Sequence, residues 1–116
     1  MKKMILLSIV LFSVSLSANE ISDKESVKRG EVVYKNNCAI CHTVNGGSAM
    51  GPDFNIVSYT RKKKDIEGYA KDPDAFYKAF GYSAQAMPTL PLEDQEFRDV
   101  ASYIDSLQPF KKWMKK

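Results

Sequence analysis

Apolar side chains recur at helical spacing most clearly near the end of the chain, over residues 93–107. The apolar stripe consists of Phe97, Val100, Ala101, Ile104 and Leu107, and Tyr103 widens it. Glu93 and Glu96 lie in the first turn, where the helix dipole favours negative charge. The pattern therefore predicts an amphipathic helix from Glu93 to Leu107.

A first helix is predicted to begin at Ser22 and to end at Asn36 and Asn37. Ser22 and Glu25 have the Ser-x-x-Glu spacing of a capping box. Small and apolar residues (Val27, Gly30, Val33, Tyr34) share one face, and the charged Lys28, Arg29, Glu31 and Lys35 are expected to face solvent. Glycine inside a helix costs about 1 kcal/mol relative to alanine. We therefore expect Gly30 to mark a close crossing with another backbone.

Two short helices are predicted in the middle of the chain. Thr60 is the expected cap of the first, over residues 61–72. Asp72 caps the second, which has Pro73 at its first position and ends before Gly81. Glycines and prolines indicate loops at 43–52 and 82–91. No segment alternates with a period of two, so the chain is predicted to be an all-α protein.

The N-terminus has the composition of a secretory signal peptide. Lys2 and Lys3 precede an apolar run that ends in small residues at Ser17 and Ala18. The run from residue 4 to residue 18 is shorter than the roughly 20 residues that an uncleaved membrane anchor needs. We therefore expect residues 1–18 to form a signal peptide that is cleaved after Ser17 or Ala18 on export to the periplasm, so that the mature chain starts at Ala18 or Asn19.

The remaining residues, 19–116, are enough for one small domain, with a core at about 26–107 and a basic tail at 108–116. Removing Lys2 and Lys3 from the 17 basic residues leaves 15 against 14 acidic ones, so the charge gives no argument for a nucleic-acid partner. The basic clusters Arg61-Lys62-Lys63-Lys64 and Lys111 to Lys116 are either solvated surface or docking sites for an acidic partner.

Cys38-Ala39-Ile40-Cys41-His42 contains both cysteines and the only histidine. A Cys-x-x-Cys-His run is the attachment signal for haem c: both thiols can bond to haem, and the imidazole can ligate the iron. A dithiol oxidoreductase would need the motif in a βαβ setting, which is missing. A zinc site would need further ligands, and adjacent Cys41 and His42 are poorly spaced for one tetrahedral ion.

The sixth iron ligand determines what a haem protein does, and methionine sulphur favours electron transfer. Three methionines remain after residue 18: Met50, Met87 and Met114. Met50 follows His42 closely, and Met114 lies in the lysine-rich tail. Met87 lies in an irregular loop followed by Pro88, far enough along the chain to reach the opposite face of the haem. Met87 is therefore the favoured ligand over its usual role as core filler, and Met50 is the next candidate.

Residues 26–107 resemble the class I cytochromes c, which are small monohaem electron carriers. The resemblance depends on Gly30 and Tyr34, the Cys38–His42 motif, Gly51-Pro52, Met87-Pro88 and the closing helix. It implies the cytochrome c fold, with terminal helices crossing around one covalent haem c, and a histidine ligand that donates to the Pro52 carbonyl. The family's mid-chain tryptophan is missing, and Tyr59 and Arg61 are the nearest substitutes for binding a haem propionate.

The resemblance implies a one-electron carrier of a periplasmic respiratory chain, not an enzyme, that meets redox protein partners as a monomer without membrane insertion. The alternative is a haem subunit within a larger periplasmic oxidoreductase complex. Phe110 and Trp113, beyond the last helix, are the only hint of such a subunit interface.

Overall fold

The computed structural model describes residues 16–47 and 49–108, and within these ranges every regular element is a helix. The all-α prediction is therefore confirmed. The helices are α1 (Leu16–Asn37), α2 (Phe54–Thr60), α3 (Lys63–Lys71), α4 (Pro73–Phe76) and α5 (Asp94–Ser106). Among these described helices, none is both long enough and apolar enough to cross a membrane. The first 15 residues of the predicted signal peptide and the tail from 109 onward lie outside the described residues.

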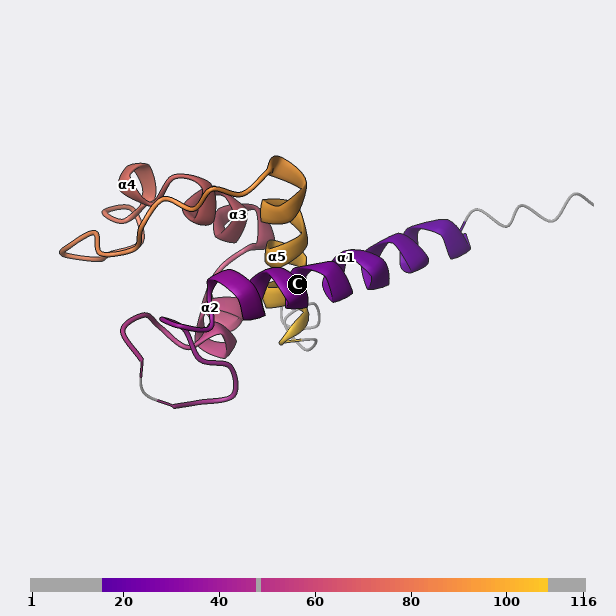
Figure 1. Ribbon diagram of the computed structural model, residues 1–116, viewed down its shortest axis with the longest axis horizontal. Coiled ribbons are helices and arrows are strands. Elements are labelled where there is room, and N and C mark those ends of the chain that lie inside the picture. The colour runs from indigo at the N-terminus through magenta and orange to yellow at the C-terminus, as the bar shows by residue number, and fades with distance from the viewer. Residues whose placement is uncertain (1–15, 48, 109–116) are drawn as a thin grey trace, which may run out of the picture.

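Helices α1 and α5 cross near the middle of the molecule, and the other helices lie to one side of the crossing (Figure 1). Gly30 of α1 lies at the contact, where a Cβ atom would overlap the carbonyl group of Asp99 and press on Tyr103. Only glycine lets the two backbones approach this closely. The prediction that Gly30 marks a helix crossing is confirmed.

A buried carboxylate fastens the same crossing. Asp99 of α5 is only 2% exposed. Arg29 of α1 donates to both of its oxygens, at 2.8 and 3.1 Å, and Ser26 donates at 2.7 Å. Gln95 adds a further bond at 2.9 Å. Burial opposes ionisation, but the donated hydrogen bonds and the positive charge of Arg29 outweigh it and hold the pKa of Asp99 below its usual range. Arg29 therefore does not simply face solvent as predicted, because Asp99 binds its guanidinium.

The hydrophobic core joins the predicted stripe of α5 to the other helices. Val100, Ala101 and Ile104 are at most 3% exposed, and they pack with Val33 of α1 and Ile66 of α3. Helix α5 contacts α1, α2 and α3. The last helix is therefore the central element, and its observed bounds differ from the predicted 93–107 by one residue at each end.

Two predicted helix starts are wrong. Helix α1 begins at Leu16, so Ser22 lies inside the helix and is not its N-cap. Leucine, alanine and glutamate, which are favourable helix formers, occur between Leu16 and Ser22, and the helix continues through them. Thr60 does not cap the next predicted helix either. It is the last residue of α2, and its hydroxyl donates to the Ile56 carbonyl at 2.8 Å.

Helix α2 was not predicted, and α4 is shorter than predicted. Asp53 begins α2 by accepting a hydrogen bond from the Asn55 amide at 2.8 Å. Asp72 caps α4 as predicted, accepting from the Ala75 amide at 3.2 Å. The α-helix ends at Phe76, however, and the chain continues in turns to Gly81, which has a φ of 82°.

Candidate functional site

An open cavity of about 300 Å³ lies beside the helix crossing. In Figure 1 the α3–α4 segment and the chain that follows it lie above, and α2 and the 38–53 loop lie below. Residues from both parts line the cavity, and most of the lining is apolar. Cys38, Cys41, His42 and Met87, the four predicted site residues, are all among them. The fold therefore brings the four predicted site residues to one cavity.

The cysteine motif continues from α1 as a single helical turn. The Cys38 amide donates to the Tyr34 carbonyl at 2.8 Å, and the His42 amide donates to the Cys38 carbonyl at 2.9 Å. Both thiols are free. Burial, together with the nearby Cys41, raises the pKa of the Cys38 thiol to about 11. Dithiol oxidoreductases depend on a lowered thiol pKa, so this environment is the opposite of the one that they need.

The imidazole of His42 is held on three sides. Its Nδ1 lies 2.9 Å from the carbonyl oxygen of Pro52. A carbonyl can only accept, so Nδ1 carries the proton and the lone pair of the neutral ring is on Nε2. Phe54 stacks on the ring with the centroids 4.4 Å apart. At Gly51 a Cβ atom would overlap the ring. The histidine is therefore oriented with the lone pair on Nε2, an arrangement that is also typical of histidines that bind metals.

Asp53 fixes the loop that carries Pro52. Its carboxylate accepts from the Thr43 hydroxyl at 2.8 Å, the Gly46 amide at 2.7 Å and the Asn55 amide at 2.8 Å. Burial raises the pKa of Asp53, but these bonds outweigh that effect and hold it below its usual range. Sequence reasoning missed Asp53, although an Asp directly before an apolar residue at a helix start was a readable signal.

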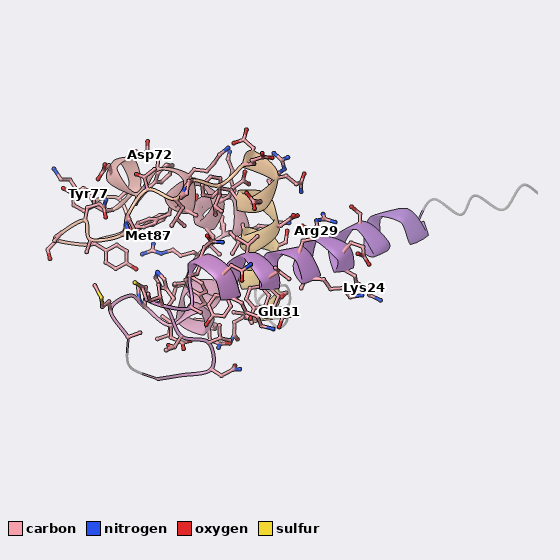
Figure 2. All side chains as sticks on the ribbon, in the orientation of Figure 1. Lys24, Arg29, Glu31, Asp72, Tyr77 and Met87 are labelled. Atoms are coloured by element: carbon pink, nitrogen blue, oxygen red, sulfur yellow. The ribbon has the colours of Figure 1, made fainter. Side chains whose placement is uncertain are left out.

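Met87 reaches the cavity from the segment between α4 and α5 (Figure 2), whereas His42 belongs to the loop that follows α1. The Met87 side chain is partly buried. Met50 also borders the cavity but is 86% exposed, so it lies at the mouth. Met114 lies outside the described residues. Of the two described methionines, both of which line the cavity, Met87 is therefore the more buried.

Of the two residues suggested for propionate binding, only Arg61 lines the cavity. Tyr59 is 55% exposed and is not part of the lining. The Arg61 guanidinium donates to the Phe80 carbonyl at 2.8 Å and lies 4.3 Å from the centroid of the Phe80 ring. Sequence reasoning named Gly51 only as part of the Gly51-Pro52 pair and missed Phe80 and Phe54 as parts of the site, because their roles depend on side-chain contacts that no sequence pattern identifies.

The chemistry of this cavity fits a haem. An apolar cavity suits the flat macrocycle, and two free thiols lie beside an imidazole whose Nε2 is left to bind iron. A partly buried thioether borders the same space. Sulphur and imidazole are the side-chain groups that hold haem iron in electron carriers.

Comparisons with known proteins agree with this chemistry. A family model described as cytochrome c matches residues 27–108. A cytochrome c-553-like protein of Synechocystis sp. is 24% identical over 108 residues, which cover 90% of this chain and 94% of that protein. Cytochrome c6 of Diacronema lutheri is 30% identical over 80 residues, covering 67% of this chain and 92% of that protein.

No solved structure matches the chain. The family match nevertheless covers most of the sequence, including all five residues of the cysteine motif, Met87 and the closing helix. Cytochromes c are electron-transfer proteins rather than enzymes, and their cofactor is covalently bound haem c. The chain therefore belongs to the cytochrome c family, as a small class I electron carrier with haem c.

Proposed function

We propose that this chain is a monomeric one-electron carrier of a periplasmic respiratory chain. In this proposal Cys38 and Cys41 bind the haem covalently, and His42 and Met87 ligate its iron. The observation that carries the proposal is the meeting of these four residues in one cavity, with His42 Nδ1 bound to the Pro52 carbonyl at 2.9 Å. The bound haem supplies the Fe(II)/Fe(III) couple.

The chain's own residues would attach, orient and enclose the haem. Cys38 and Cys41 would each hold the haem through a thioether, the product of adding S–H across a vinyl double bond with no leaving group. The Pro52 carbonyl keeps His42 in one tautomer. Met87 would bind the iron as a second side-chain ligand, which would keep small ligands away from it.

An apolar rim at the cavity mouth supports transient contact with redox partners. Ile40, between the two cysteines, is 88% exposed, and Met50 and Ile56 at the cavity are 86% and 61% exposed. Exposed apolar groups next to a site often mark protein contacts. Weak electron-transfer complexes bury only a small area, less than about 1,200 Å². A few exposed apolar side chains at and near the cavity suit such a transient complex.

The periplasmic address depends on the N-terminal segment. Removal of residues 1–18 would also remove Leu16, Ser17 and Ala18, the first three residues of α1. All contacts of α1 with α5 described above begin at Ser26 or later. The mature helix would therefore keep its crossing intact after cleavage.

Purification from the periplasm under native conditions tests this function. The proposal predicts a monomer whose mass lacks residues 1–17 or 1–18, whose haem stays with the polypeptide in acid–acetone, and which titrates reversibly with one electron. Stoichiometric co-purification with an oxidoreductase would instead assign the chain as a haem subunit. Phe110 and Trp113, the residues that suggested this alternative, lie outside the described residues.

A further inference from the structure

Arg61 makes two contacts with Phe80, the first residue of the 80–92 segment that contains Met87. It donates to the Phe80 carbonyl at 2.8 Å, and its guanidinium carbon lies 4.3 Å from the ring centroid. Arg61 and Phe80 both line the cavity. The planar guanidinium thus bonds the backbone and covers the ring of one residue at once, a combination that lysine cannot reproduce.

Two aromatic rings also pack against Phe80. Tyr69 of α3 lies 5.2 Å from Phe80 between ring centroids, and Phe76 of α4 lies 6.0 Å away. Tyr82 then packs against Tyr69 at 5.9 Å. These centroid distances fall in the range of favourable aromatic pairs. Phe80 is therefore the fixed end of the segment, and the chain beyond Gly81 reaches Met87 without a helix.

Arg61 lies on the short connection between α2 and α3. Its amide donates to the Val57 carbonyl at 2.9 Å, which ties it to the end of α2. The same residue thus links α2, which begins at the loop holding His42, to the segment that carries Met87. A link between these two segments would oppose their separation.

We infer that Arg61 is a positioning residue that holds the 80–92 segment against the cavity and thereby keeps Met87 on the iron. The inference depends on the proposed ligation by Met87. Loss of Arg61 leaves the Phe80 carbonyl without its charged donor and removes the cover from the Phe80 ring. The segment then opens more easily, and an added ligand competes better for the sixth position.

Imidazole binding to the ferric holoprotein measures this opening, followed by the absorbance of the haem. The test uses Arg61→Met and Arg61→Lys in the full chain. Lys62→Met is the matched control, because Lys62 is the exposed neighbouring cation and its loss changes the charge equally. Met87→Ala gives the affinity of a fully open site. The sulphur–iron absorption of each ferric protein is a second reading.

We expect Arg61→Met to bind imidazole about tenfold more tightly than wild type, which corresponds to about 1.4 kcal/mol of binding free energy. Its sulphur–iron absorption should be weaker than that of wild type. The imidazole affinity of Arg61→Lys should lie between those of wild type and Arg61→Met, and that of Lys62→Met should match wild type. Wild-type affinity in Arg61→Met, or full rescue by lysine, would overturn the inference. If Met87 were not the ligand, Met87→Ala would itself bind imidazole as wild type does, so failure of the proposed ligation is recognised separately.

Discussion

Replacing Asp99 by asparagine tests the physical account of the helix crossing. The carboxylate is 2% exposed and accepts hydrogen bonds from Arg29, Ser26 and Gln95. Asparagine keeps the volume but loses the charge, and its amide group faces donors at one of the two oxygen positions. Breaking a buried charged pair costs about 3–5 kcal/mol. Because the Arg29 side chain stays 52% exposed and can turn to water, we expect the lower end, about 3 kcal/mol.

The unfolding free energy that Asp99→Asn loses should be smaller at low pH than at neutral pH. The folded pKa of Asp99 lies below its unfolded value of about 3.9, so its contribution is fully present above that pH. As the pH falls through the folded pKa, the wild-type carboxyl also becomes neutral. The difference in unfolding free energy between wild type and Asp99→Asn should therefore shrink below about pH 4.

Guanidinium unfolding of the holoproteins, followed by far-ultraviolet circular dichroism at pH 7 and at pH 3, measures both effects. Asp94→Asn is the matched control on the same helix, because Asp94 forms an exposed pair with Lys71 at 3.0 Å. Exposed pairs contribute little, so this control should lose far less stability. Equal losses in the two variants, or a loss at Asp99 that does not change with pH, would refute the reasoning.

Three further variants test other parts of the molecule. Gly30→Ala should lower the melting temperature, because overpacking against Asp99 costs about 1–3 kcal/mol and exceeds the helix-propensity gain of about 1 kcal/mol; a raised melting temperature would contradict the close crossing. Cys38→Ser with Cys41→Ser should abolish acid–acetone-stable haem, and retained haem would disprove covalent attachment. Asp53→Asn should speed hydrogen exchange of the histidine Nδ1 proton, measured by nuclear magnetic resonance in the reduced protein, and an unchanged rate would show that the loop needs no such clamp.

The sequence predicted the parts of the fold that follow from local patterns. The stripe of α5 has a strong period, so its bounds differed from the prediction by only one residue at each end. Gly30 was placed correctly because a glycine in a helix interior needs a compensating contact. The motif residues were readable because their order along the chain is the chemical signal itself.

Several side-chain contacts between distant segments were not predicted. The bond between Arg29 and Asp99 joins residues 70 positions apart, and nothing in the spacing of α1 identifies it. Helix α2 has only seven residues, which is too short for a periodic pattern to emerge. The Ser22 capping box failed because the same spacing occurs inside helices that continue.

The central claim is that Met87 and His42 share one iron, and the reduction potential of Met87→Ala tests it most directly. The measurement compares holoproteins of wild type and variant by redox titration, with the sulphur–iron absorption recorded on the same samples. The account predicts that haem stays covalently attached, that the absorption disappears and that the potential falls, because a methionine ligand raises it. An unchanged potential with retained sulphur–iron absorption would contradict the claim and pass the role to Met50.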